Sequence, residues 1–137
     1  MTYQIMVVDD DPAILDVMRM ILEDDGYEVV TASSKAEVLG WAGTRPDLIL
    51  LDIWLSGDSG QAICRQLKDD PTMQEIPVIL VSANHDAEGI ARESGADGFI
   101  RKPFDLDEVL DTVRRQLDRT GDKVPASNLS TIPTIPS

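Results

Sequence analysis

The sequence predicts an α/β domain built on an open, doubly wound parallel sheet with helices on both faces. Three runs of consecutive apolar residues, at 5–8, 48–51 and 78–81, indicate strands that are covered on both sides, as in a parallel sheet. Segments with helical spacing of apolar residues separate these runs, and right-handed crossovers between parallel strands then wind the chain over both faces. The length of 137 residues suits one domain.

Strands and helices alternate five times along residues 1–120. Two weaker strand candidates, at 28–32 and 99–100, complete a five-stranded sheet, and we expect them nearer its edges. The first helix follows Asp11, an N-cap acid before a proline at the first helical position, and it ends at Gly26.

The other four helices are predicted from their caps and apolar spacing. Capping pairs, Ser34 with Glu37 and Asp105 with Glu108, open the second and fifth helices. The third helix, at 60–67, carries apolar residues at helical spacing, and we expect Cys64 in or beside the core. The fourth, at 86–94, has the thinnest apolar face. Near residue 121 the composition becomes rich in proline, so we expect 1–120 to form the domain and 121–137 a disordered tail or linker.

The composition excludes several classes of function. Acidic residues number 25 against 12 basic ones, which gives a net charge of −13. This charge argues against direct binding of nucleic acid or anionic lipid, because both require a basic surface. The sequence has neither the ~18 consecutive apolar residues of a membrane span nor a signal peptide, and its single cysteine suits a reducing compartment. We therefore expect a cytoplasmic protein.

Polar side chains follow four of the predicted strands at the point where each strand ends. The first strand is followed by Asp9, Asp10 and Asp11, the third ends in Asp52, the fourth in Ser82, and the fifth runs into Lys102. In doubly wound sheets, ligands bind outside the carboxyl ends of the strands. Asp11 fits a helix cap better than a ligand. The convergence of the other residues at one edge indicates a functional site.

The charges in this cluster point to a divalent cation and a phosphoryl group. Asp9, Asp10 and Asp52 crowd three negative charges together, which raises pKa values and destabilises the fold. Carboxylate oxygens without a nearby His or Cys select Mg²⁺, Mn²⁺ or Ca²⁺, and Mg²⁺ with phosphate oxygens is the usual arrangement in phosphoryl transfer. Lys102 adds a positive charge suited to a phosphate oxygen, and Ser82 adds a hydroxyl donor.

Four motifs in this order and spacing resemble the receiver domain of two-component response regulators, of the single-domain chemotaxis-regulator type. The motifs are Val7-Val8-Asp9-Asp10-Asp11, Leu50-Leu51-Asp52, Val81-Ser82-Ala83 and Arg101-Lys102-Pro103-Phe104. The resemblance covers about residues 3–120. It implies the flavodoxin-like strand order 2-1-3-4-5 and a signalling domain rather than an enzyme, limited to self-phosphorylation from phosphodonors and slow self-dephosphorylation.

The resemblance also implies a role for each site residue. Asp52 accepts a phosphoryl group from a histidine kinase or phosphotransfer protein. Asp9, Asp10 and Asp52 hold Mg²⁺ together with the backbone carbonyl of Trp54. Ser82 and Lys102 bind the phosphoryl oxygens, and the Lys102–Pro103 bond is cis. Ser82 and Phe99 act as the switch, and a downstream protein binds the face made by the fourth helix, the fifth strand and the fifth helix.

The sequence departs from the usual receiver pattern mainly between residues 53 and 60. Ser56 stands where proline is usual, and Ser59-Gly60 replaces Asp-Gly at the start of the third helix. The switch hydroxyl is a serine where threonine is common. Phe99 occupies the aromatic switch position, so a tyrosine-type hydrogen bond is absent there.

Three other functions compete with a phosphorylated receiver. A haloacid-dehalogenase-type phosphatase also uses a strand-end Asp with Mg²⁺, but it should have Thr or Val where this chain has Ala13. A flavodoxin-type flavin binder would have Ser or Thr and Gly, not three acids, after the first strand. A receiver-like binding module that is never phosphorylated differs in one respect, namely whether Asp52 takes up phosphate. Two other conspicuous residues suggest no site, since we expect His85 in a loop and Trp41 in helix packing.

Overall fold

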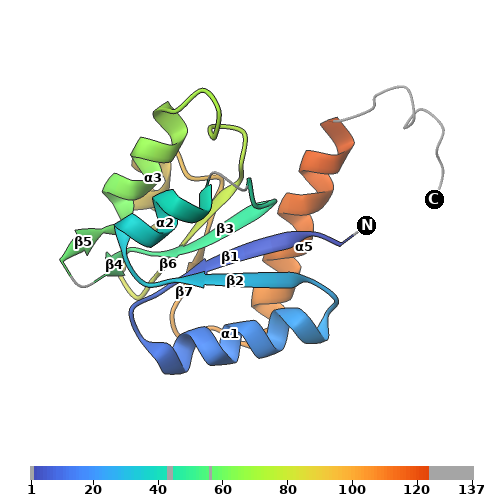
Figure 1. The fold of residues 1–137 in the computed structure, drawn as a ribbon. Helices are drawn as coiled ribbons and strands as arrows, with labels where there is room; N and C mark the ends of the chain where they lie inside the picture. The colour runs from blue at the N-terminus through green and yellow to red at the C-terminus, as the bar shows by residue number, and fades with distance from the viewer. Residues whose placement is uncertain (1, 43–44, 56, 124–137) are drawn as a thin grey trace.

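A computed structural model describes residues 2–42, 45–55 and 57–123, in which a parallel sheet lies between two layers of helices (Figure 1). The sheet contains β1 (Gln4–Val8), β2 (Glu28–Ala32), β3 (Leu48–Asp52), β6 (Val78–Ser82) and β7 (Gly98–Arg101). Its spatial order is β2-β1-β3-β6-β7, and all four neighbouring pairs are parallel. This order confirms the prediction for the five main strands.

Five helices cover the two faces of the sheet. They are α1 (Pro12–Asp24), α2 (Lys35–Ala42), α3 (Gly60–Asp69), α4 (Ala87–Ser94) and α5 (Leu106–Lys123). The helices α1 and α5 cover one face, and α2, α3 and α4 cover the other, as Figure 1 shows. None of the helices in the described part of the chain is long and apolar enough to span a membrane.

The central strands have continuous apolar runs because both of their faces are buried. On β1, Ile5 and Val7 pack with α1 and α5, whereas Met6 and Val8 pack on the opposite side. The same alternation holds along β3 and β6, so consecutive residues enter two separate cores. Each residue of β3 and β6 is buried, including Asp52 and Ser82 at their carboxyl ends.

Three predicted N-cap side chains accept hydrogen bonds from the helices that they open. Asp11 Oδ1 accepts from the Ala13 amide at 2.9 Å, and Asp105 Oδ1 accepts from the Glu108 amide at 2.8 Å. At α2, the Ser34 hydroxyl accepts from the Glu37 amide at 3.2 Å. The Glu37 carboxylate accepts from the amide of Ser33 at 2.6 Å instead of that of Ser34, so the capping box is shifted by one residue.

Two features near the site and at the C-terminus extend the predicted fold. The strands β4 (Trp54–Leu55) and β5 (Asp58–Ser59) pair antiparallel between β3 and α3, around a turn in which Gly57 has a φ of 79°. The helix α5 continues past residue 120 to Lys123, two positions before Pro125, and proline disfavours helical backbone in the residue before it. The predicted tail, 121–137, therefore begins within this helix, and its part from 124 to 137 lies outside the described residues.

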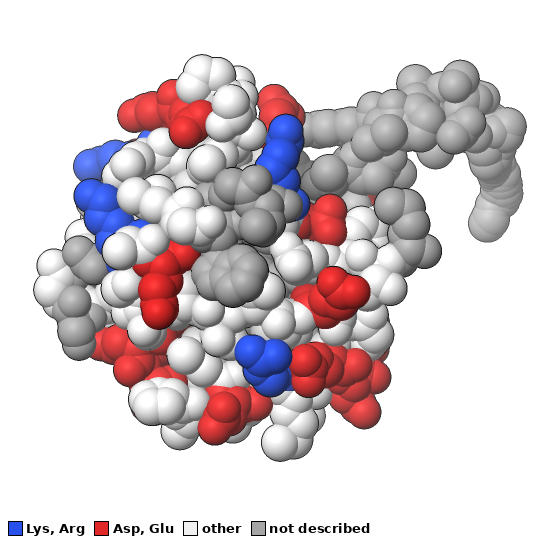
Figure 2. All heavy atoms as spheres, viewed as in Figure 1, with Lys and Arg blue, Asp and Glu red and all other residues white. Residues whose placement is uncertain are grey.

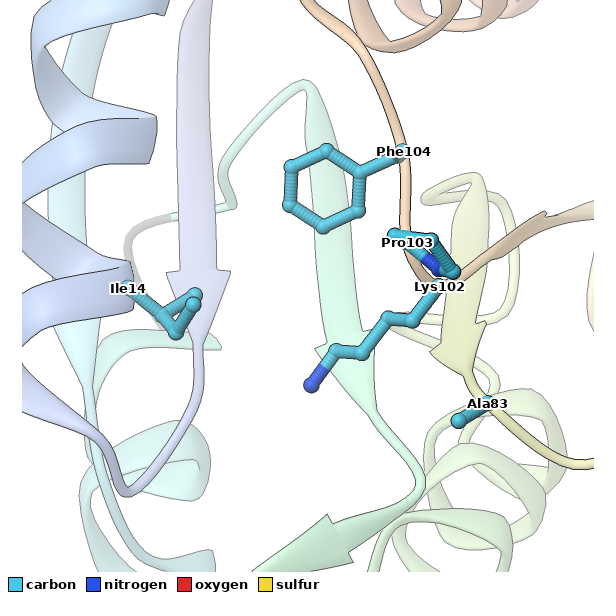
Figure 3. A pocket seen from close by; sticks show the side chains of 5 residues that line it. All are labelled: Ile14, Ala83, Lys102, Pro103 and Phe104. Carbon is cyan, nitrogen blue, oxygen red and sulfur yellow. The ribbon is translucent and has the colours of Figure 1, made fainter.

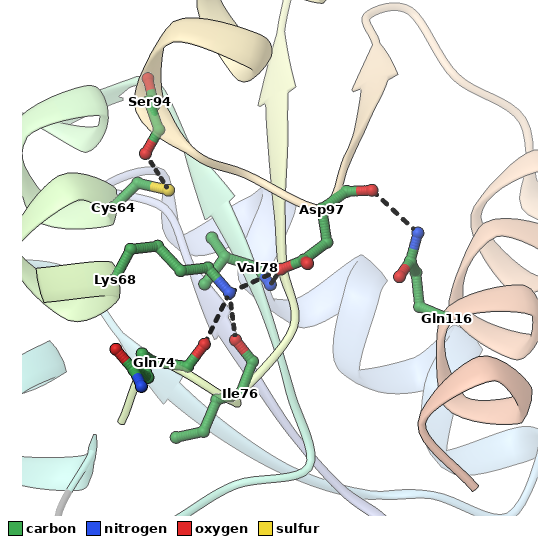
Figure 4. A network of polar contacts seen from close by, with 8 residues as sticks. All are labelled: Cys64, Lys68, Gln74, Ile76, Val78, Ser94, Asp97 and Gln116. Atoms are coloured by element: carbon green, nitrogen blue, oxygen red, sulfur yellow. Dashed lines mark hydrogen bonds and ion pairs between the residues drawn. The ribbon is translucent and has the colours of Figure 1, made fainter. Parts of the chain in front are cut away.

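A polar network joins α3 to the amino ends of β6 and β7, at the edge of the sheet opposite Asp52 (Figure 4). Lys68 Nζ donates to the carbonyls of Gln74 at 3.2 Å and Ile76 at 2.8 Å, and to Asp97 Oδ2 at 2.7 Å. Asp97 Oδ2 also accepts from the Val78 amide at 2.8 Å. One lysine therefore holds the connection from α3 to β6 against the residue that precedes β7.

The two ends of α4 are held differently. At its C-terminal end, the Ser94 carbonyl accepts from Cys64 Sγ at 3.5 Å, and Gly95 adopts the left-handed conformation with a φ of 81°. At its N-terminal end, the side chain of Asp86 makes no capping hydrogen bond. The loop before this end is held by Asn84, whose Oδ1 accepts from the Asp86 amide at 2.7 Å. The opposite end, at Ser94, lies beside the Lys68 network (Figure 4).

Acidic side chains outnumber basic ones on the surface. Figure 2 shows Asp and Glu atoms gathered along the lower edge of the molecule, over α1, with few Lys and Arg atoms between them. The helix α1 has no basic residue in its last turn, where a positive charge would favour the helix dipole. Instead, Arg114 of α5 reaches Asp25 at the end of α1, with N–O distances of 3.0 and 3.1 Å.

Candidate functional site

The carboxyl ends of four strands bring the predicted site residues together. Asp9 follows β1, Asp52 ends β3, Ser82 ends β6 and Lys102 follows β7. Carboxylate oxygens of Asp9, Asp10 and Asp52 lie within 4.8 Å of one another. Lys102 Nζ lies 3.5 Å from Asp9 Oδ2 and 3.6 Å from Asp52 Oδ2. One lysine therefore faces a cluster of three carboxyl groups.

The three carboxyl groups differ in their surroundings. Asp9 is buried, and its Oδ1 accepts from the Asp11 amide at 2.9 Å, which orients the carboxylate within the loop that opens α1. Asp52 is 7% exposed, whereas Asp10 lies at the surface. Because Asp10 is on the solvent side of the cluster, the site is open to small ligands from that direction.

Burial raises the pKa of Asp52 to about 6, because its charged form loses solvation. The positive charge of Lys102 and a hydrogen bond from the Trp54 amide oppose this increase, whereas the negative charges of Asp9 and Asp10 add to it. In the absence of a cation, the carboxyl group of Asp52 is thus close to half protonated at pH 6. An added positive charge in the cluster would favour its ionised form.

The donor set fits a hard divalent cation. Oxygen ligands from three carboxylates, with no His or Cys among them, match the preferences of Mg²⁺. The Trp54 carbonyl is the further ligand that the resemblance to receiver domains implies. The amide of the same residue lies 3.5 Å from Asp52 Oδ1, which places the Trp54 backbone beside the carboxyl cluster.

Ser82 and Lys102 are held side by side by the pairing of their strands. The Lys102 amide donates to the Ser82 carbonyl at 2.8 Å, and the Lys102–Pro103 peptide bond is cis, as predicted. Ser82 is 3% exposed, and its hydroxyl oxygen accepts from the Asn84 amide at 2.9 Å. The backbone that carries both polar side chains is thus held in place at the edge of the site.

Phe99 lies on the edge strand β7, away from the carboxyl cluster. Its half-buried ring packs against the core formed with α2, α3 and α4. The Arg101 guanidinium carbon lies 5.8 Å from the ring centroid, within cation–π range. Arg101 also donates to the carbonyl of His85 at 3.2 Å, so it links the ring to the loop after β6. Residues two apart on a strand lie on the same face of the sheet, and this spacing was the only sequence signal for the contact between Arg101 and Phe99.

Gly60 has a role at the site that its sequence position did not indicate, as Arg101 does beside Phe99. Its amide donates to the Ile53 carbonyl at 2.7 Å, which brings the start of α3 against the residue after Asp52. A Cβ atom at position 60 would collide with the backbone carbonyl oxygen of Asp52. The position therefore requires glycine, and α3 packs directly on the backbone of the carboxyl cluster.

Three residues expected to be structural lie where the sequence placed them. Asp11 caps α1, and the exposed His85 lies in the loop after β6. Cys64 is fully buried in the core, where loss of solvation raises the pKa of its thiol to about 11. Trp41 belongs to α2, but its side chain is outside the described part of the structure.

Comparison with known proteins agrees with this arrangement. A family model for the response regulator receiver domain matches residues 5–114. The master transcriptional regulator RpaA from Synechocystis is 38% identical over 126 residues, which cover 89% of this chain and 52% of that protein. The DNA-binding response regulator MtrA from Mycobacterium tuberculosis is 35% identical over 133 residues, covering 95% and 57%. This chain spans about half the length of these curated relatives.

Solved structures show the same likeness. A CheY-like receiver domain from Methanospirillum hungatei has a TM-score of 0.82 and 28% identity, covering 90% of this chain and 99% of that one. The receiver domain of a signal transduction histidine kinase from Syntrophus aciditrophicus has a TM-score of 0.81 and 33% identity, covering 90% and 94%. These neighbours share the fold along nearly their entire length.

Proposed function

The chain belongs to the response regulator receiver family, which serves phosphorylation-based two-component signalling, and on that premise we propose that Asp52 is its phosphoacceptor. In this proposal Asp52 receives a phosphoryl group from the phosphohistidine of a histidine kinase or phosphotransfer protein. The observation that supports it most directly is the buried Asp52 carboxyl group, with Lys102 Nζ at 3.6 Å. The family assignment decides against the phosphatase and flavin-binding alternatives.

The proposed reaction requires the ionised form of Asp52. One carboxylate oxygen attacks phosphorus, and the bond from phosphorus to the donor breaks as the acyl phosphate forms. Lys102 places its ammonium group where it can neutralise a phosphoryl oxygen, and the buried Ser82 hydroxyl lies at the end of the adjacent strand. These residues orient the group and stabilise its charge. Self-phosphorylation from phosphodonors and slow self-dephosphorylation are the only reactions we propose.

Asp9, Asp10, Asp52 and the Trp54 carbonyl would hold Mg²⁺, which when bound neutralises charge on the phosphoryl oxygens. The clustering of the three carboxylates within 4.8 Å supports this assignment. Substitution Asp10→Asn removes one ligand charge at the exposed side of the cluster. We expect it to weaken Mg²⁺ binding by about tenfold or more, measured by titration calorimetry. An unchanged affinity would show that Asp10 is not a ligand.

We further propose that the α4–β7–α5 face binds a downstream protein and that Ser82 and Phe99 switch this face. Ser82 joins the site to the loop before α4, and Phe99 lies on β7 within the same face. The proposal predicts that Lys102→Ala permits phosphorylation but uncouples it from changes in α4. Phosphorylation-dependent changes in NMR chemical shift that are confined to α1 and α2 would contradict it.

We also propose that residues 1–120 are the receiver unit and that 121–137, whose first three residues continue α5, lead out of it as a tail or linker. The family match to residues 5–114 supports the first part. The kinase and the downstream target are partners of this unit, and we propose no direct contact with nucleic acid or membrane, since the chain has a net charge of −13.

Phosphorylation of the intact chain tests the central proposal. Wild type, Asp52→Asn and the matched surface control Asp16→Asn are incubated with Mg²⁺ and acetyl phosphate, and the mass of each is measured. We expect one added phosphate on wild type and on Asp16→Asn, and none on Asp52→Asn. An unmodified wild type would instead favour the third alternative, a binding module that is never phosphorylated. Phosphate on Asp52→Asn would place the acceptor elsewhere.

A further inference from the structure

A pocket of about 510 Å³ opens beside the carboxyl cluster, on the side of Lys102 (Figure 3). Its walls come from the first turn of α1, the residue after β6 and the segment after β7. The lining residues are Ile14, Ala83, Lys102, Pro103 and Phe104. Figure 3 shows the Lys102 ammonium group extending between Ile14 and Ala83, with the Phe104 ring farther along the same hollow.

The pocket combines apolar walls with a single positive charge. Four of the five lining residues offer only hydrocarbon side chains, and the fifth ends in the Lys102 ammonium group. That group is also 3.6 Å from Asp52 Oδ2. A ligand that matches both features carries an anionic group at Lys102 and a small apolar group beyond it.

We propose that this pocket binds the acyl chain of acyl phosphates, so that donors with chains longer than acetyl phosphorylate Asp52 more efficiently than acetyl phosphate does. The proposal rests on Asp52 being the phosphoacceptor. In an acyl phosphate, one bridging oxygen and one carbonyl carbon separate phosphorus from the chain. A phosphoryl group that approaches Asp52 with one oxygen turned to the Lys102 ammonium group, in place of the present 3.6 Å contact, brings the chain carbons to the apolar walls on the same side.

The transfer balances without a further reactant. A carboxylate oxygen of Asp52 attacks phosphorus and forms a new P–O bond. The bond from phosphorus to the bridging oxygen breaks, and its electron pair stays on that oxygen. The acyl group leaves as a carboxylate, so no proton is consumed or released by an ionised Asp52. The pocket contributes binding of the chain and no chemistry.

The size of the effect follows from the hydrocarbon that the pocket can cover. Complete burial of one methylene strengthens binding by about fourfold. Butyryl phosphate has two methylenes more than acetyl phosphate, and the pocket is open on one side. We therefore expect the second-order rate constant for phosphorylation of Asp52 by butyryl phosphate to exceed that for acetyl phosphate by roughly three- to tenfold. The two leaving carboxylates have nearly equal basicity, so the comparison isolates the chain.

Kinetics with the two donors, in Mg²⁺ and with intact-mass detection, give this ratio for wild type and variants. Ile14→Thr makes one wall polar, and Ala83→Leu fills the pocket from an exposed position that tolerates a larger side chain. We expect both variants to bring the ratio close to one. Val17→Thr is the matched control, because it makes the same kind of change on α1 at a side chain that is 47% exposed and outside the pocket. It should keep the wild-type ratio.

Binding can be separated from reaction with alkylphosphonates, which resemble the donors but cannot transfer phosphorus to Asp52. Without metal, an NMR titration with butylphosphonate should shift the signals of Ile14 and Phe104 more strongly than methylphosphonate does. A wild-type kinetic ratio of one or less, or butylphosphonate shifts that avoid both residues, would overturn the pocket assignment. If neither donor phosphorylates wild type, or if Asp52→Asn is modified, then the proposed phosphoacceptor itself is wrong.

Discussion

Replacing Asp52 with asparagine should stabilise the metal-free protein at alkaline pH and leave its stability nearly unchanged at acidic pH. Burial raises the pKa of Asp52 to about 6 in the folded protein, whereas an unfolded chain has an aspartate pKa of roughly 3.9. Between these values the folded state binds more protons than the unfolded state. The free energy of unfolding therefore falls as the pH rises through this range, and the full penalty is present above pH 6.

The structure sets the expected magnitude. A pKa difference of about two pH units corresponds to roughly 3 kcal/mol, at 1.36 kcal/mol per unit. This value already contains the favourable contact with Lys102, which Asp52→Asn removes. The asparagine side chain keeps the shape of aspartate and can still accept from the Trp54 amide. We therefore expect Asp52→Asn to stabilise the protein by about 1–3 kcal/mol near pH 8, with 3 kcal/mol as the upper bound.

Urea unfolding in the presence of a chelator, from about pH 4.5 to about pH 8.5, measures this difference directly. Asp16→Asn on α1 is the control for loss of an exposed carboxylate. The stability difference between Asp52→Asn and wild type should grow from about pH 4.5 to about pH 6 and level off above that, and Mg²⁺ should reduce it by stabilising wild type more. A difference that is constant with pH, or a variant that is less stable than wild type near pH 8, would refute the reasoning.

Three further predictions concern the surroundings of the site and the opposite edge of the sheet. The Trp54 side chain is 70% exposed beside Asp52, and its indole has one donor and no acceptor with which to orient water. We therefore expect Trp54→Asn to shorten the half-time of self-dephosphorylation in excess Mg²⁺. An equal or longer half-time would exclude shielding by the indole. Gly60→Ala should cost about 2 kcal/mol or more in urea unfolding because its Cβ meets backbone, whereas Gly40→Ala, which meets nothing within 4 Å, should be neutral or stabilising. Lys68→Met should cost about 1–3 kcal/mol, because it leaves two carbonyls and the Asp97 carboxylate without their shared donor. A loss below about 0.5 kcal/mol would mean that water replaces that donor.

The main strands and the position of the site were predictable because both depend on patterns that are continuous in the sequence. The run at 48–51 is apolar at every position, since β3 is buried on both faces, and its next residue must lie at the carboxyl edge. The same reasoning placed Asp9, Ser82 and Lys102 at that edge. Proximity of these side chains follows from parallel strand order and needs no knowledge of loop conformation.

Features that depend on local backbone geometry were not predictable in this way. The strands β4 and β5 have two residues each, too few to show any hydrophobic period. Gly60 was recognised as the start of α3, but its contact with the Asp52 carbonyl depends on how closely the helix approaches β3. The pocket beside Lys102 combines side chains from three separate segments, and no spacing along the chain encodes their distance.

The two ends of α4 are anchored to different parts of the molecule. The Cys64 contact with the Ser94 carbonyl and the adjoining Lys68 network restrain the end that is remote from Asp52. The end near Ser82 begins at Asp86, whose side chain makes no capping hydrogen bond. The first turn is held instead through the loop before it, where the Asp86 amide donates to Asn84 Oδ1 at 2.7 Å and Arg101 donates to the His85 carbonyl at 3.2 Å. Because the Asn84 amide donates to the Ser82 hydroxyl, a movement of that hydroxyl reaches this loop first, whereas the last turn stays tied to α3.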